Sequence, residues 1–408
     1  MKELGANALI DCTFVRSIIL SNGLTKIGKR VFYKCRNLET IVIPETVTKI
    51  GPGAFADSGL KSITLLDGRR LTEIGEGSFS DCINLETIVI PKTVTKIGPE
   101  AFAGSGLKSI TLLDGRLTEI GKGTFSDCSN LETVVIPNSV TKIGPEAFES
   151  SGLKSITLLD GRLTEIGEEA FYECRKLETI AIPNSVTKIG RYAFAHSGLK
   201  SITLPDGLTE IGKYVLFNCF NLETIDIPET VTKIDFEAFT GSGLKSITLP
   251  HGLIEIGERA FYKCSELETV VISETVIKFG PKAFARSGLK TLILQHGLTK
   301  IGVRVFYGCD NLETVAIPET VTKICPFAFA ESGLKSITLL DGRLTEIGWG
   351  AFSYCRNLET VVIPDSVTKI GPYAFANSGL KSITLPDGVE IGEGAFRDCH
   401  NLVVKHRD

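Results

Sequence analysis

The chain has 408 residues, and its 44 Lys and Arg against 48 Asp and Glu give a formal net charge of −4. So small a charge gives no electrostatic reason to expect nucleic acid or an anionic membrane as a partner. Hydrophobic residues make up 43% and charged residues 23%, as in an ordinary soluble protein. No stretch approaches the roughly 18 consecutive apolar residues of a transmembrane helix, so we predict no membrane insertion.

Residues 1–23 form an irregular first segment, which we predict to be an N-terminal capping coil. Asp11, Arg16 and Ser17 interrupt its apolar positions, so it lacks the apolar core of a secretory signal. Residues 24–408 follow as an array of about sixteen to seventeen coils of 21–24 residues. No Pro/Gly/Ser-rich linker divides that array, and we predict a single domain.

A phenylalanine recurs at this spacing from Phe32 to Phe396, and only Leu216 interrupts the row. The row holds 16 of the 22 phenylalanines. Self-similarity at this period is typical of a solenoid, in which each coil packs only on its neighbours. We therefore predict that these phenylalanines are the largest core side chains.

Two versions of the coil alternate, LTEIGEGSFSDCINLETIVIP at 71–91 and VTKIGPEAFAGSGLKSITLLDG at 94–115. Alternating apolar residues predict a strand that ends before Pro91, and a second short extended piece at 94–97. The glycine after that piece, Gly98, is predicted to adopt a positive φ. The following Ala-Phe segment is predicted to be a turn or a short 3₁₀ helix.

Charges alternate at the outward position that precedes each strand, as in Glu86, Lys108, Glu132, Lys154 and Glu178. In a parallel stack each Glu would lie between two Lys, whereas identical charges would repel. We predict that this alternation helps to fix the register of the coils.

Nine cysteines, from Cys35 to Cys399, each lie three residues after the row position in alternate coils. Neighbours in this set would be about 9–10 Å apart, beyond the roughly 7 Å between Cα atoms that a disulfide allows. We predict small buried free thiols, which suit a reducing or anaerobic setting. Cys12 lies one coil from Cys35, so this pair alone could bridge, and Cys325 replaces a turn glycine.

The unit C-x-x-L-x-x-I-x-I-P-x-x-V-x-x-I-G-x-x-A-F, carried by residues 128–148 and 355–375, resembles the BspA-like class of leucine-rich repeats. The resemblance covers essentially the whole chain. It implies a β-rich α/β solenoid, a leucine-rich repeat right-handed superhelix with a parallel β-sheet on one face and short turn or 3₁₀ segments on the other. Members of the class look like surface or secreted proteins that adhere to matrix proteins such as fibronectin and fibrinogen.

No motif for catalysis, nucleotide binding or zinc binding occurs, so we predict no enzyme activity, no cofactor and no metal site. His251 and His296 occupy the same turn position two coils apart, too far for shared metal ligation. We interpret them as solvated turn residues.

Departures from the repeat are the better candidates for partner contacts, because binding residues need not obey the stack. One group surrounds Leu216, and its aromatic members are either a patch for a partner or a repacking in which Phe217 covers for Leu216. Two further departures are an apolar residue on the strand face and the single tryptophan. The candidate partner-binding residues are Tyr214, Phe217, Phe220, Asp226, Phe236, Ile293 and Trp349.

The leading functional prediction is a non-enzymatic, protein-binding, adhesin-like surface or secreted protein that contacts host or matrix proteins. A long repetitive surface would also supply avidity. The alternatives are an intracellular interaction scaffold, which the absent signal and the free thiols favour, and a structural spacer. The chain ends within a strand at residues 401–404, which predicts end-to-end self-association as a further option.

Overall fold

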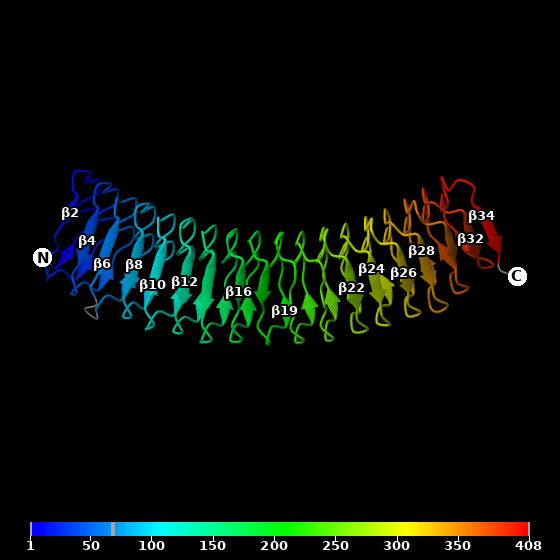
Figure 1. Ribbon diagram of the computed structural model, residues 1–408, viewed down its shortest axis with the longest axis horizontal. Coiled ribbons are helices and arrows are strands. Elements are labelled where there is room, and N and C mark those ends of the chain that lie inside the picture. The colour runs from blue at the N-terminus through cyan, green and yellow to red at the C-terminus, as the bar shows by residue number, and fades with distance from the viewer. Residues whose placement is uncertain (1, 67–69, 407–408) are drawn as a thin grey trace. The chain divides into compact units, whose positions relative to one another are not determined.

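A computed structural model describes residues 2–66 and 70–406 of the chain. The chain forms two compact units, Met1–Gly207 (unit 1) and Leu208–Asp408 (unit 2), each considered by itself. Both are parallel β-solenoids with the leucine-rich repeat fold (Figure 1). The two units contain about 18 turns in total.

The long strands come one per coil and pair in parallel. In unit 1 they are β2 (Ser17–Ile18), β4 (Thr40–Ile43), β6 (Ser62–Leu65), β8 (Thr87–Ile90), β10 (Ser109–Leu112), β12 (Thr133–Ile136), β14 (Ser155–Leu158), β16 (Thr179–Ala181) and β18 (Ser201–Thr203). In unit 2 they are β22 (Thr269–Ile272), β24 (Thr291–Leu294), β26 (Thr314–Ile317), β28 (Ser336–Leu339), β30 (Thr360–Val362), β32 (Ser382–Leu385) and β34 (Val403–His406). Two isolated bridges, Asp226 to Thr248 and Ser246 to Thr269, continue this row in unit 2.

The second extended piece forms a row of two-residue strands. In unit 1 these are β1 (Glu3–Leu4), β3 (Lys26–Ile27), β5 (Lys49–Ile50), β7 (Glu73–Ile74), β9 (Lys96–Ile97), β11 (Glu119–Ile120), β13 (Lys142–Ile143), β15 (Glu165–Ile166) and β17 (Lys188–Ile189). In unit 2 they are β19 (Glu210–Ile211), β20 (Lys233–Ile234), β21 (Glu255–Ile256), β23 (Lys278–Phe279), β25 (Lys300–Ile301), β27 (Lys323–Ile324), β29 (Glu346–Ile347), β31 (Lys369–Ile370) and β33 (Glu390–Ile391).

The predicted α/β character and 3₁₀ segments are not found among residues 2–66 and 70–406, which contain no helix. The row residue is instead flanked by two left-handed residues, as Phe102 is by Glu100 and Gly104, with φ of 55° and 64°. A left-handed residue interrupts any right-handed helical run, so each coil closes through consecutive turns.

The predicted phenylalanine row forms the core of each unit. Neighbouring rings stack at 5.0–5.6 Å between centroids in unit 1, from Phe32 to Phe194. They stack at 4.9–5.8 Å in unit 2, from Phe239 to Phe396. Leu216 is also fully buried, as its place in the row predicts.

The predicted ladder of alternating charges consists of separate Lys–Glu ion pairs rather than a continuous chain of contacts. Each lysine of the long-strand row pairs with the glutamate of the preceding coil, as Lys154 does with Glu132 at 2.7 Å. Strand pairing explains this choice. β12 and β14 pair over four residues, whereas β10 and β12 pair only through Ser109 and Thr133. Each Glu therefore lies between two Lys in the stack, as predicted, but forms an ion pair with only one of them, because alternate interfaces pair over different numbers of residues.

The cysteines hold the interfaces that the strands pair more weakly. Sγ of Cys128 donates to the carbonyl of Phe102 at 3.1 Å and lies 3.4 Å from Oγ of Ser105, both in the preceding coil. All eleven thiols are free, including Cys12 and Cys35. Burial raises the pKa of Cys128 to about 11, so these groups are structural donors and poor nucleophiles.

Glycines of the Ile-Gly position serve close packing, and the predicted positive φ at Gly98 is wrong. Gly98 is absent from the left-handed residues, but a Cβ there would lie 2.5 Å from the backbone nitrogen of Glu76. The backbone of the preceding coil lies too close to leave room for a side chain at Gly98.

Candidate partner-binding surface

Each coil turns around its row residue, and three positions of that turn can carry side chains to the surface, although small residues at the middle position, such as Ala285 and Ala330, are buried. They are the positions two before, one after and two after the row residue, and we call them the turn face. The first and the last of these positions are left-handed in the described coils from Phe32 to Phe396, with φ of 51–68°. Because packing does not fix their identity when they reach the surface, their chemistry is free to vary.

The turn face of unit 2 is basic and aromatic. Between the coils of Phe261 and Phe306 it contains no carboxylate. Its cations there are Arg259, Lys263, Lys282, Arg286 and Arg304. Tyr262 lies beneath two of them, with centroid distances of 5.8 Å to Arg259 and 5.5 Å to Lys263.

Four turn-face residues, Arg286, Arg304, Tyr307 and Phe327, form the most connected part of this surface together with Trp349, which lies one residue before the first turn-face position of its coil. We call these five residues the arginine–aromatic ridge. Arg304 lies over the rings of Tyr307 and Phe327, at 6.0 and 5.0 Å. Phe327 packs against Trp349 with ring centroids 5.2 Å apart. Trp349 nevertheless remains 51% exposed. A large, half-exposed aromatic side chain that is already held in place is the type of residue that dominates binding energy at protein interfaces.

The ridge is also fixed by hydrogen bonds and bordered by shallow grooves. A hydrogen bond to Glu331 raises the pKa of Tyr307, while Arg286 lies 5.9 Å from the Tyr307 ring centroid. Arg286 and Glu331 line one groove, and Glu331 and Tyr354 line its neighbour. An incoming side chain would therefore meet ordered donors on a surface with relief.

The turn face of unit 1 has the opposite charge. Between the coils of Phe55 and Phe171 it carries carboxylates and no Lys or Arg. These are Asp57, Asp81, Glu100, Asp127, Glu146, Glu149, Glu169 and Glu173. Burial raises the pKa of Glu149, and so do the surrounding carboxylates; the same causes raise the pKa of Glu169.

The candidates named from the sequence fall into separate places. Tyr214 and Phe217 lie on the turn face of unit 2, and Phe236 lies beside it, one residue before the first turn-face position of the next coil. Tyr214 is edge-on to Phe217 at 5.8 Å and to Phe236 at 5.2 Å. All three are half-buried. Trp349 lies on the same side of its coil, in the ridge.

The other three candidates lie off the turn face. Phe220 is 67% exposed in the loop after Cys219 and makes no ring contact among the described residues. Asp226 and Ile293 lie on the long-strand face, where Ile293 is 47% exposed. Sequence reasoning missed Arg286, Arg304, Tyr307 and Phe327; the signal was that each lies one or two residues from a row phenylalanine.

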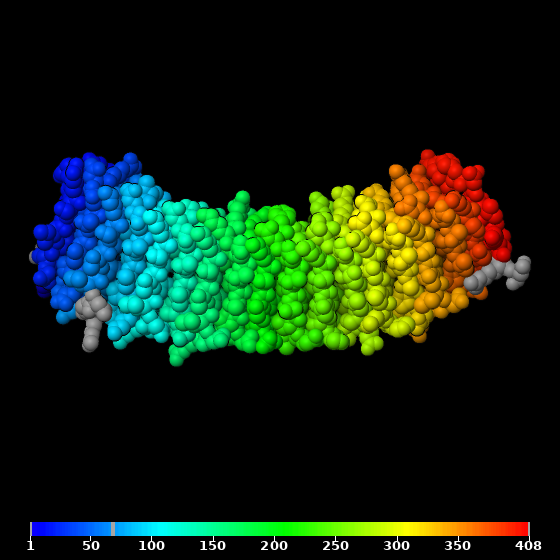
Figure 2. All heavy atoms as spheres, in the orientation of Figure 1, coloured from blue at the N-terminus to red at the C-terminus, as the bar shows by residue number. Residues whose placement is uncertain are grey.

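The described residues, 2–66 and 70–406, contain no group of three or more His, Cys, Asp or Glu side chains placed to hold a metal ion. His251 and His296 instead face Glu229 and Glu319, at 3.4 and 3.1 Å. None of the described segments is a helix that could span a membrane. On the face seen in Figure 2 the coils within each unit pack side by side without a deep hollow.

Fold and surface together define a leucine-rich repeat solenoid with an open, chemically varied turn face. A family model for the BspA type leucine-rich repeat region matches residues 2–115, 60–163, 164–290 and 278–403, so the chain belongs to that family. Among solved structures, a leucine-rich repeat protein from Bacteroides ovatus is similar, with 26% identity, a TM-score of 0.57, and coverage of 96% of this chain and 91% of that one. A leucine rich cell surface protein from Faecalibacterium prausnitzii has 25% identity and a TM-score of 0.42, with coverage of 96% and 87%. A comparison with curated proteins gave no match.

Proposed function

We propose that this chain is a non-enzymatic protein-binding repeat protein that contacts its partner through the arginine–aromatic ridge of unit 2. Leucine-rich repeat proteins are generally protein-interaction scaffolds, and the family membership supports that class here. The observation that carries the proposal is the set of Arg304, Phe327 and Trp349, which contact one another while Arg304 and Trp349 remain exposed.

The ridge selects a partner by charge and shape. Arg286 and Arg304 present guanidinium groups, which bind carboxylates with two parallel hydrogen bonds. Trp349 offers an apolar area for an aliphatic or aromatic side chain. The partner surface is therefore acidic, with an apolar residue near its centre.

The finer proposal is an adhesin-like role at the cell surface or in secreted form, with matrix proteins such as fibronectin and fibrinogen as partners. The family resemblance supports this role. The row of buried free thiols favours a second candidate, an intracellular scaffold, since unbridged cysteines in such number suit a reducing compartment.

The test is retention of the full chain on immobilised fibronectin and fibrinogen. We expect binding that weakens as ionic strength rises, because exposed charges are screened. Trp349→Ala and Arg304→Glu should each lower affinity by about tenfold or more, since hot-spot residues contribute roughly 2 kcal/mol or more.

The matched control is Glu169→Arg, which changes the charge at the equivalent turn-face position of unit 1. It should leave affinity unchanged. Absence of retention, or equal losses from Arg304→Glu and Glu169→Arg, would contradict the proposal.

A further inference from the structure

A second surface, on the short-strand face of unit 2, departs from the side chains of the repeat in two ways at one place. Its residues are Ile254, Ile277, Lys278 and Lys300, and we call it the short-strand patch. It lies apart from the turn face, on the row of β21, β23 and β25.

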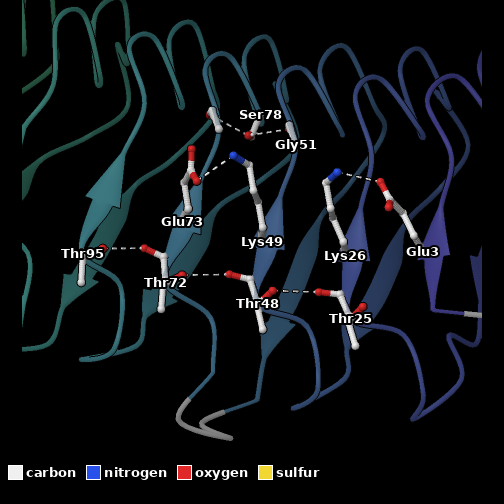
Figure 3. A network of polar contacts seen from close by, with 11 residues as sticks. Glu3, Thr25, Lys26, Thr48, Lys49, Gly51, Thr72, Glu73, Ser78 and Thr95 are labelled. Carbon is white, nitrogen blue, oxygen red and sulfur yellow. Dashed lines mark hydrogen bonds and ion pairs between the residues drawn. The ribbon is translucent and has the colours of Figure 1, made fainter.

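The regular form of this face is seen in unit 1 (Figure 3). Threonines of successive coils form a ladder, in which Oγ1 of Thr48 donates to the carbonyl of Thr25 at 3.0 Å. A row of Lys and Glu runs beside it, where Lys49 pairs with Glu73 at 2.7 Å. The threonines, and the lysines and glutamates of these coils, are thus bonded to one another, which leaves little for a partner to bind.

The first departure is apolar. Ile254 and Ile277 replace two successive threonines of the ladder and are 46% and 60% exposed. The backbone is unchanged, because Ile254 N–H still donates to Thr232 and Ile277 N–H to Ile254, at 2.8 and 3.1 Å. Neither isoleucine enters the core, so packing gives no reason for the replacement.

The second departure is electrostatic. Alternation would place a carboxylate at Lys300, but successive coils carry Lys278, Lys300 and Lys323. Lys278 pairs with Glu255 and Lys323 with Glu346, at 2.7 and 2.8 Å. Among the residues the structure describes, Lys300 has no ion pair. The residue in register with it in the next coil is another lysine, Lys323.

The backbone ladder also opens at this place, as it does once in unit 1. The short-strand ladder stops between β23 and β25. The bond that Thr322 N–H makes to Thr299 has no equivalent from Thr299 to Ile277 among the described residues. Unit 1 opens in the same way between β9 and β11, but there the side chains are Thr95, Lys96 and Glu119. Lys96 also has no ion pair among the described residues, but carboxylates, Glu73 and Glu119, occupy the coils on both sides of it. The opening itself therefore does not require isoleucine or a lysine between two lysines.

We propose that the short-strand patch is a second docking site, for an extended protein segment that carries an apolar side chain next to carboxylates. Charge complementarity determines the chemistry of this segment: its carboxylates pair with Lys300, and its apolar side chain covers Ile254 and Ile277. The exposed isoleucine pair supplies apolar contact area, and Lys300, which has no ion pair among the described residues, fixes the orientation of the bound segment.

The repeat provides a variant in which the patch is erased and the fold preserved. Ile254→Thr and Ile277→Thr restore the threonine ladder. Lys300→Glu restores a carboxylate between Lys278 and Lys323. Because each substitution returns the coil to its consensus, the triple variant should melt at the same temperature as the wild type or higher.

A phage-displayed library of random dodecapeptides is selected in parallel on the wild-type full chain and on this triple variant. We expect clones that bind only the wild type and carry Asp or Glu beside Leu, Ile or Phe. A synthetic peptide from such a clone should bind the triple variant at least tenfold more weakly, and should bind Arg304→Glu as it binds the wild type.

Two results would overturn the proposal. One is that both proteins select the same clones, so that no peptide depends on the patch. The other is that the discriminating peptides lack carboxylates.

Discussion

The turn faces of the two units share a backbone and differ in chemistry. In unit 1 the position two before the row residue holds Glu146 and Glu169; in unit 2 it holds Arg304 and Phe327, and all four are left-handed. The fold therefore sets where a side chain is presented, while the residue type at that position is left open. Function in such a solenoid is read from the departures between equivalent coils.

If the turn face serves binding and the core serves folding, exposed residues of the ridge should contribute much less to stability than the row phenylalanines. Phe261→Ala should lower the unfolding free energy by about 3–5 kcal/mol, because the fully buried ring leaves a cavity in the stack. Trp349→Ala should cost less than about 1 kcal/mol, since half of its surface is already exposed. Urea denaturation measures both, and similar losses would mean that Trp349 belongs to the core.

The cysteine contacts should contribute equally to the stability of the two units, although the turn faces of those units differ in chemistry. Cys128→Ala in unit 1 and Cys264→Ala in unit 2 each leave a buried carbonyl and a serine hydroxyl without the thiol. We expect similar losses of about 1–3 kcal/mol, checked by hydrogen exchange in the affected coils. A loss in one unit only would show that the interfaces are not equivalent.

The same thiols predict a stability limit at alkaline pH. Burial raises the pKa of Cys264 to about 11 and that of Cys174 to about 12, from an ordinary value of 9.0. A folded-state pKa above the unfolded one means that this contribution is complete below pH 9 and is lost as pH rises toward 11. Melting temperatures from pH 8 to 11 should fall in both units, and Cys264→Ala should reduce the pH dependence. A flat profile would contradict the account.

Charge reversal on the long-strand face should have a smaller effect. Lys154→Glu and Lys200→Glu break pairs with Glu132 and Glu178, of 2.7 and 2.9 Å, and place like charges together. Exposed pairs of this kind contribute about 1 kcal/mol or less each. The double variant should melt at a lower temperature, and more so at low salt. An unchanged melting temperature would remove these pairs from any role in register.

The smallest effect is expected on the acidic turn face of unit 1. The pKa of Glu149 is raised by burial and by neighbouring carboxylates, so its charge is unfavourable at neutral pH. Glu149→Gln should stabilise unit 1 by a few tenths of a kcal/mol at pH 7. The gain should vanish at acidic pH, where Glu149 is protonated in both states. A loss of stability at pH 7 would indicate that the carboxylate serves a contact.

The sequence predicts the repeating parts of the molecule because one physical requirement recurs in every coil. The buried phenylalanine row, the strands, the prolines that end them and the free thiols follow from spacing alone. The 3₁₀ segments and the positive φ at Gly98 were mispredicted. Left-handed conformation is carried here by Glu100 and Tyr192 as readily as by glycine, so residue type does not mark it.

The candidate site was only partly accessible from the sequence. Tyr214, Phe217 and Phe236 were identified as departures, and the structure places them together. Arg304 and Phe327 were not, because each is unremarkable until the offset from the row phenylalanine brings it beside Tyr307 or Trp349. Contacts between coils depend on register, which the sequence of one coil does not contain.

The central claim is that the basic, aromatic turn face of unit 2 binds the partner. The most direct measurement is the affinity for immobilised fibronectin and fibrinogen of a triple variant, Lys282→Glu, Arg286→Glu and Arg304→Glu, which gives unit 2 the charge of unit 1. We predict a loss of at least about tenfold with an unchanged melting temperature. Undiminished affinity in the folded variant would contradict the claim.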